Sequence, residues 1–426
     1  MAQPLYETED ERRERALLVS VDTGEFDAAV SLEELAELAA TAGAEVVDTA
    51  IQKKEAPDKA TCLGSGRAEE LARQCAAEDV DLVIVDRELS PTQQRNLEDV
   101  FPCRVIDRTT LILDIFAGRA QSAEGRLQVE LAQLQYRLPR LSGQGAALSR
   151  LGGGIGTRGP GESKLESDRR HIRRRITALR EQLEKLDSQR TLRRQRRRKD
   201  GIPTVALVGY TNAGKSTLLN ALTDAGVLAE DKLFATLDPT ARALRLPDGR
   251  QVMLVDTVGF VRRLPHQLVQ AFRSTLEEAV EADVILNICD ASSPYAAEHL
   301  QVTGALLAEL GCGEHPILQV MNKWDRVIAA PAEETDLRVC ISARTGQGLP
   351  QLLERVAALL PPDRRRVTLL LPFSQGALAE QCRREGQVER EAYVPEGLRM
   401  TVTLGARLLA ETAPFVTDAA ENPDVD

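Results

Sequence analysis

Apolar and polar positions follow two different periods along the first part of the chain. The segments 16–20, 45–50, 82–85 and 103–107 are short apolar runs, as expected of buried strands. The stretches between them carry apolar residues three and four positions apart, which predicts amphipathic helices. Repeated alternation of this kind predicts a small α/β domain at residues 1–118, with a parallel sheet covered by helices.

Two of these predicted helices carry start signals. Ser31 and Glu34 stand three positions apart at the start of the helix before 45–50, which predicts a capping box. Ser90 before Pro91 predicts a second cap, with a proline in the first turn. The run Gly64-Ser65-Gly66 before another helix is compatible with a phosphate site, although so short a run is more often a turn.

Residues 119–201 follow a third pattern, in which apolar residues step by four and three. The first set is Leu127, Leu131, Leu134, Leu138 and Leu141, and the second is Ile172, Ile176, Leu179, Leu183 and Leu186. Each set predicts a narrow seam of coiled-coil type, and a glycine-rich segment lies between them. We therefore predict an antiparallel helical hairpin with a glycine-rich tip loop.

Strand and helix signals resume at residue 202 and continue to 361. They predict a mostly parallel sheet with helices on both faces. Residues 362–426 then read as strand, helix and two further strands, which predicts a small α+β domain.

Charge changes this picture in one region. The chain has a net charge of -11, yet arginine dominates residues 164–199. The plain explanation is a solvated coiled-coil face. The scarcity of opposing acids favours contact with RNA phosphates instead, and the scarcity of aromatic residues argues against base stacking. The candidate RNA contacts are Arg169, Arg170, Arg173 and Arg174, with Arg158 in the tip loop.

Cysteine and hydropathy patterns predict a cytoplasmic protein. The seven cysteines include no C-x-x-C pair, and the four histidines are scattered, which argues against disulfides and a zinc cluster. No apolar run is long enough to span a bilayer, and the polar start of the chain does not resemble a signal peptide. Peripheral association with a membrane stays open.

One segment matches the phosphate-binding pattern G-x-x-x-x-G-K-[ST], between a predicted strand and a predicted helix. Its residues are Gly209, Tyr210, Thr211, Asn212, Ala213, Gly214, Lys215 and Ser216. Glycines let backbone N–H groups face phosphate oxygens, and the helix N-terminus adds favourable partial charge. Lys215 is expected to reach the β- and γ-phosphates, and the Ser216 hydroxyl to bind Mg²⁺.

A second motif, Asn322-Lys323-Trp324-Asp325, follows the predicted strand 316–321 and identifies the base. A carboxylate at Asp325 can accept hydrogen bonds from two N–H groups of guanine that adenine lacks, so adenine should be rejected strongly. Asn322 either binds guanine O6 or braces the phosphate loop, and the Lys323 stem covers the base. Backbone N–H groups of Ser342, Ala343 and Arg344 are placed to contact guanine.

The residues between these motifs predict two switches. Phe234, Ala235, Thr236, Leu237 and Asp238 form the first, in which Thr236 or Thr240 supplies a Mg²⁺ ligand. Asp256, Thr257, Val258 and Gly259 form the second: Asp256 holds Mg²⁺ through water and the Gly259 N–H senses the γ-phosphate. Together these motifs predict a GTPase, with Lys215, Gly259 and the threonine that binds Mg²⁺, Thr236 or Thr240, as its catalytic residues.

The motifs GYTNAGKSTL, LFATLDPT, DTVGFVRRLPH and NKWD resemble those of the HflX family of translational GTPases, as does RLGGGIGTRGPGESKLESDRR between the two seams. The resemblance implies the same four parts along the chain and chooses Thr236 as the switch ligand. It also implies binding of GTP, GDP and Mg²⁺, and action on the large ribosomal subunit and its rRNA. The duty implied is splitting or rescue of stalled ribosomes, or subunit maturation, under stress. Trp324 is a small departure from the family pattern.

Phe260 follows Gly259 where many such hydrolases carry a glutamine that aims the attacking water. We therefore expect the isolated chain to hydrolyse GTP slowly, and to hydrolyse it faster when the ribosome orders the switches. Away from the ribosome, we expect the chain to be a monomer. Asn212 is a candidate K⁺ ligand, as in some related GTPases. The alternative function is a tRNA-modifying or other RNA-binding GTPase, but Cys382 stands alone in an ordinary helix.

Overall fold

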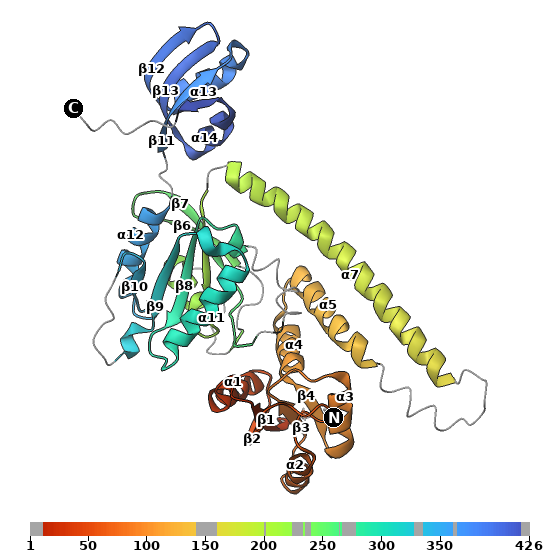
Figure 1. The fold of residues 1–426 in the computed structure, drawn as a ribbon. Helices are drawn as coiled ribbons and strands as arrows, with labels where there is room; N and C mark the ends of the chain where they lie inside the picture. Colours follow the sequence, from red (N-terminus) through yellow and green to blue (C-terminus); the bar gives the residue numbers. More distant parts are fainter. Residues whose placement is uncertain are drawn as a thin grey trace, which may run out of the picture.

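The computed structural model describes residues 12–141, 160–199, 202–223, 233–234, 240–263, 265, 278–327, 335–360 and 364–418. These residues form three β-sheets and a pair of long helices (Figure 1). The predicted fold class is confirmed: an α/β unit, a helical hairpin, a mostly parallel sheet and a small α+β unit follow one another. The boundaries at 118, 201 and 361 stay predictions.

The N-terminal domain has a parallel sheet of order β2-β1-β3-β4. Its strands are β1 (Arg15–Asp22), β2 (Glu45–Lys53), β3 (Leu82–Val85) and β4 (Arg104–Asp107), and its helices are α1 (Ala28–Thr41), α2 (Ser65–Ala77), α3 (Pro91–Val100) and α4 (Arg108–Arg119). Alternate residues of β1 point to opposite faces. Leu18 joins the core under α1 and α4, whereas Leu17 joins the core under α2 and α3.

The two predicted caps have different outcomes. Ser90 caps α3 in a capping box with Gln93, as predicted. The box predicted from Ser31 and Glu34 is wrong, because α1 begins earlier and the Asp27 side chain accepts from the first backbone N–H groups. Ser31 and Glu34 instead contact residues more than 170 positions away. Both side chains form tertiary hydrogen bonds instead of capping the helix.

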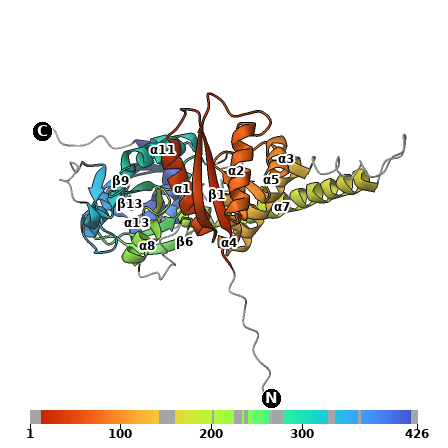
Figure 2. The same cartoon turned by 90° about the horizontal axis from the view of Figure 1, so that it is seen from below.

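The helical hairpin consists of α5 (Ala123–Arg140) and α7 (Pro160–Lys199). Leu131, Ile176 and Leu179 are buried between the helices, which confirms the predicted seam. Glu130 pairs with Arg175 at 2.7 Å, and the earlier Glu124 pairs with the later Arg190 at 3.2 Å, so the helices are antiparallel. Seen from below, α7 extends away from the rest of the molecule (Figure 2).

The central sheet has the order β10-β9-β8-β5-β7-β6, and β6 alone of its described strands is antiparallel to its neighbour. Its strands are β5 (Thr204–Gly209), β6 (Thr240–Arg245), β7 (Gln251–Asp256), β8 (Val284–Asp290), β9 (Ile317–Asn322) and β10 (Arg338–Cys340). The helices are α8 (Lys215–Thr223), α11 (Ala296–Glu309) and α12 (Leu349–Leu359), with short turns η2 (Cys312–Glu314) and η3 (Trp324–Arg326). Separate cores lie on the two faces of this sheet.

The C-terminal domain is an antiparallel sheet of order β12-β13-β11-β14. Its elements are β11 (Arg364–Leu371), η4 (Phe373–Gln375), α13 (Gly376–Glu385), β12 (Gln387–Val394), β13 (Gly397–Gly405), α14 (Ala406–Thr412), η5 (Ala413–Phe415) and β14 (Val416–Asp418). Neither α14 nor β14 was predicted from the sequence. β14 pairs with β11, and α14 packs on β11 and adds Leu408 to the core around Leu369 and Met400.

Candidate functional site

The predicted phosphate loop joins β5 to α8, which begins at Lys215. Two of its glycines are required by close approach. A Cβ on Gly209 would lie 2.1 Å from the Ile288 carbonyl oxygen, and a Cβ on Gly214 would lie 2.3 Å from Asn322 Nδ2. Gly214 also has a φ of 93°, in the left-handed region that glycine tolerates. The loop therefore wraps closely against β8 and β9.

Lys215 and Ser216 lie at the start of α8, under this loop. The Lys215 ammonium is buried and donates to the carbonyl oxygens of Gly209 at 3.1 Å and Tyr210 at 2.9 Å, and burial lowers its pKa to about 8. The Ser216 hydroxyl donates to the Asp256 carboxylate at 2.8 Å. Hydroxyl and carboxylate oxygens are the ligands that Mg²⁺ prefers, so this pair fits the predicted magnesium position.

The second switch begins beside the phosphate loop. The Phe260 N–H donates to the Gly209 carbonyl at 3.1 Å, and the Thr211 N–H donates to the Phe260 carbonyl at 2.8 Å. A Cβ on Gly259 would lie 2.8 Å from Thr211 Cγ2 and 3.0 Å from Lys215 Nζ, so only glycine fits there. Thr257 is fully buried and donates to the Leu207 carbonyl at 2.7 Å.

The base motif is fixed by side chains around Asn322. The Asn322 amide donates to the Ala213 carbonyl at 2.8 Å and accepts from the Ala343 N–H at 3.0 Å, so Asn322 braces the phosphate loop. Of the two alternatives raised for this residue, the brace is confirmed. The Ser342 hydroxyl donates to Asp325 at 2.6 Å, and this bond holds the pKa of the carboxylate below its ordinary value. Asp325 is thereby kept charged as an acceptor.

Comparison with known proteins identifies the family. Three family models match in succession: a GTP-binding GTPase N-terminal model at 29–117, a GTP-binding GTPase middle-region model at 119–197 and a 50S ribosome-binding GTPase model at 204–323. GTPase HflX of Caldanaerobacter subterraneus is 50% identical over 95% of this chain and 94% of its own length. The chain belongs to the HflX family of GTPases.

Further matches agree with this assignment. HflX of Escherichia coli is 43% identical over 93% of each chain. A crystal structure of a GTP-binding protein from Sulfolobus solfataricus in complex with GDP is 26% identical over 81% of this chain and 98% of that one, with a TM-score of 0.43. Because that score is low, the assignment rests on the sequence matches. As an HflX-family GTPase the chain hydrolyses GTP to GDP and phosphate.

Several predicted residues of this HflX-family site lie elsewhere or outside the described residues. Ala235, Thr236, Leu237, Asp238 and Arg158 fall outside them. Phe234 is buried against Phe116, with ring centroids 4.6 Å apart, so its side chain belongs to a core. Arg344 is exposed and Trp324 is half-buried at the start of η3.

Asp290 was missed by the sequence analysis. It ends β8, and its carboxylate lies 2.9 Å from the Lys323 ammonium. Burial alone would raise the pKa of Asp290, but hydrogen bonds from Ser292 and Lys323 keep that pKa below its ordinary value. Lys323, with a φ of 60°, is thus held in place within the base motif. An acidic residue directly after an apolar strand was the available signal.

The N-terminal domain also contributes to this region, which no local pattern predicted. Leu233, Phe234, Val258 and Val261 from the switches lie in the same hydrophobic core as residues of β1, α1 and α4. The Arg263 guanidinium donates to the Asp86 carboxylate at 2.8 Å and to the Asp86 carbonyl at 3.0 Å. Asp86 follows β3, beside β1, where the strand order of this sheet reverses and open α/β sheets commonly bind ligands. In this HflX-family chain, Arg263, shortly after the second switch, occupies that position.

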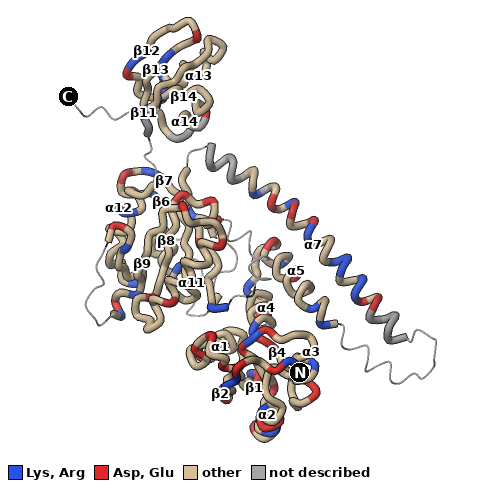
Figure 3. The backbone as a smooth tube through the Cα atoms, viewed as in Figure 1, with Lys and Arg blue, Asp and Glu red and all other residues tan. Residues whose placement is uncertain are grey.

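The candidate RNA contacts lie on the first half of α7. Arg170, Arg173 and Arg174 are exposed, and Arg169 is half-buried. In Figure 3 the backbone of this stretch of the helix is coloured at basic positions, with acidic positions among them. The neighbouring Arg175 is instead held by Glu130 through two hydrogen bonds of 2.7 Å.

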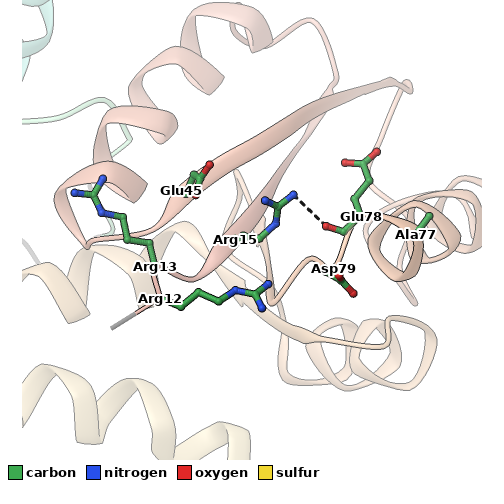
Figure 4. A pocket seen from close by; sticks show the side chains of 7 residues that line it. All are labelled: Arg12, Arg13, Arg15, Glu45, Ala77, Glu78 and Asp79. Carbon is green, nitrogen blue, oxygen red and sulfur yellow. Dashed lines mark hydrogen bonds between the residues drawn. The ribbon is translucent and has the colours of Figure 1, made fainter. Parts of the chain in front are cut away.

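The Gly64-Ser65-Gly66 run and a hollow in the N-terminal domain do not support a second nucleotide site. The Gly64 N–H donates to the Gln52 side chain at 2.8 Å, so the predicted Gly64-Ser65-Gly66 site is covered by an amide. A hollow at the amino ends of β1 and β2 mixes both charges (Figure 4). There Arg15 donates to the Glu78 carbonyl at 3.1 Å. Among the described residues, no helix combines the length and apolar character needed to cross a membrane.

Proposed function

We propose that this GTPase acts on the large ribosomal subunit, where it splits or rescues stalled ribosomes, or assists subunit maturation, under stress. The observation that carries the proposal is the row of exposed arginines on α7. The seam fixes α7 to α5, and α5 packs on α4 of the domain that contacts both switches. Contact between this row of arginines and rRNA phosphates can therefore change the position of the switches at the nucleotide site. We place this action in the cytoplasm.

Within that proposal, each loop has a role in the GTP and GDP cycle. Lys215 binds the β- and γ-phosphates, and the Gly259 N–H binds the γ-phosphate. Ser216 and Thr236 hold Mg²⁺, with Asp256 behind Ser216. When bound, Mg²⁺ neutralises charge on the β- and γ-phosphate oxygens. Asp325 selects guanine, as the Ser342 hydrogen bond supports.

Phe260 supplies no group to aim the attacking water, since its side chain is buried at 2% exposure. The isolated chain therefore binds GTP but positions water poorly. Docking on the ribosome orders the switches and raises turnover, because alignment and electrostatics supply most of the catalysis in phosphoryl transfer.

Sedimentation with large ribosomal subunits tests the proposal. With a non-hydrolysable GTP analogue, the chain should co-sediment, and Arg173→Glu should weaken binding by about tenfold at moderate salt. Arg355→Glu is the matched control, because Arg355 lies on α12 and pairs with Asp336 at 2.7 Å. Equal binding by the two variants would count against an RNA face on α7.

A K⁺ ion is a second element of the proposal. Asn212 has a φ of 59° in the phosphate loop, and its side-chain oxygen lies 3.5 Å from Lys323 Nζ. That oxygen accepts a hydrogen bond from Lys323 and would also bind a K⁺ beside the phosphates, whose charge would replace that of an arginine finger. GTP turnover should be faster in KCl than in NaCl. Equal turnover in the two salts would show that K⁺ has no catalytic role.

The alternative of a tRNA-modifying GTPase gains no support from the described residues. Such an enzyme would need an accessible catalytic cysteine. Cys382 is fully buried in the core of the C-terminal domain, and burial raises the pKa of its thiol. A buried neutral thiol is a poor nucleophile.

A further inference from the structure

A closed ring of hydrogen bonds holds the backbone of Arg262, shortly after the second switch. The Arg262 N–H donates to the Tyr210 hydroxyl at 2.7 Å, and that hydroxyl donates to the Glu34 carboxylate. The Arg108 guanidinium donates to the other oxygen of Glu34 and to the Arg262 carbonyl, the latter at 3.1 Å. Both polar groups that flank Arg262 Cα are therefore satisfied by side chains from the phosphate loop and the N-terminal domain.

The ring is buried and rigidly supported. Tyr210 is 5% exposed, and the side chains of Arg108 and Glu34 are 3% and 9% exposed. The Tyr210 ring stacks on His299 with centroids 3.9 Å apart. The remaining arm of Arg108 donates to Asp86 at 3.0 Å. In such surroundings hydrogen bonds are strong and their geometry is fixed.

The ring lies close to the residue that senses the γ-phosphate. Residues 259–262 are tied down twice: at Phe260, through the backbone bonds to Gly209 and Thr211, and at Arg262, through the ring. Gly259, at the start of this stretch, faces Thr211 and Lys215. Without the ring, the Gly259 N–H would be positioned relative to the phosphate loop by the Phe260 bonds alone.

We infer that Tyr210 is a positioning residue for γ-phosphate recognition, and that Glu34 and Arg108 of the N-terminal domain complete the same device. By holding the Arg262 peptide, they hold the Gly259 N–H where a γ-phosphate oxygen can accept from it. GDP lacks that oxygen, so the ring favours GTP over GDP. The inference depends on GTP binding but not on the proposed action at the ribosome.

The test measures the ratio of affinities for a non-hydrolysable GTP analogue and for GDP, without ribosomes. Tyr210→Phe keeps the stack on His299 and removes the hydroxyl, and Glu34→Ala removes the acceptor. Each should lower the ratio by about tenfold, the loss expected for one buried hydrogen bond to a charged partner. The double variant should also lose only about tenfold, because both changes break one ring.

Two neighbouring changes serve as controls. Tyr295→Phe and Glu33→Ala alter a second contact between the same domains, a 3.5 Å hydrogen bond outside the ring. They should leave the ratio unchanged. Thermal unfolding identifies any variant that fails to fold. If Glu34→Ala fails to fold, Tyr210→Phe alone tests the inference. An unchanged ratio in folded Tyr210→Phe, an equal shift in the controls, or an additive loss of about a hundredfold in the double variant would overturn the inference.

Discussion

Phe260 occupies the position at which many GTP hydrolases carry a glutamine, and its side chain packs into the core beneath α11. Its neighbours there include Ala206, Val208 and Leu307. The backbone of Phe260 still serves the site, since its N–H and carbonyl bond to the phosphate loop. The sequence could predict that a phenyl ring does not aim water. It could not predict where the ring goes, because that depends on a core built from distant strands.

Restoring a glutamine should therefore harm this protein. Phe260→Gln buries an amide among apolar side chains and should lower the free energy of unfolding by about 2–4 kcal/mol. It should not raise GTP turnover in the absence of ribosomes. Urea unfolding and single-turnover hydrolysis measure the two effects, and a stable variant with faster hydrolysis would contradict this placement of the ring.

His299 should make folding sensitive to acid. Burial lowers the pKa of His299 from 6.5 to about 4, and the charge of Arg262 adds to this effect. The unfolded chain takes up this proton at a higher pH than the folded chain. The stabilisation is therefore present above the unfolded pKa and is lost as the pH falls toward the folded pKa.

The change from about pH 7 to about pH 5 should cost about 2 kcal/mol of unfolding free energy through this group. His299→Phe keeps a ring against Tyr210 and should not show this part of the loss. Urea unfolding of both proteins at the two pH values gives the comparison. An equal loss in both would mean that His299 is not the acid-sensitive group.

At the scale of elements, periodicity predicted most of the fold. The apolar steps of four and three located both helices of the hairpin, and the short apolar runs located the strands of the first sheet. Local signals failed where a side chain had a distant partner. Ser31 and Glu34 satisfy the capping-box spacing, yet Arg263 and Tyr210 take them, and nothing near residue 31 in the sequence marks those partners.

The seam between α5 and α7 should unfold as a unit when its centre is truncated. Leu179 is fully buried there, so Leu179→Ala should cost about 2–4 kcal/mol and speed amide exchange across α5. Leu192→Ala on the same helix is the control, because Leu192 is 58% exposed. Similar exchange in the two variants would show that the seam does not hold the hairpin.

At the scale of the whole molecule, the chemistry of the nucleotide site was predictable and its surroundings were not. The phosphate loop and the base motif are each a continuous run of residues, so the residue pattern of each motif alone indicates its ligand. The cover over the second switch comes from Glu34, Asp86 and Arg108, which approach it only in the folded chain. These contacts connect the switches to the domain that packs against the arginine-bearing hairpin.

In the proposed function, the ribosome completes a catalytic site that the isolated chain leaves unfinished. Single-turnover GTP hydrolysis, measured with and without large ribosomal subunits, tests it most directly. We predict a rise of at least about tenfold with subunits, below the factor of about 10³–10⁵ that an arginine finger can supply. The same hydrolysis rate with and without subunits would contradict the account.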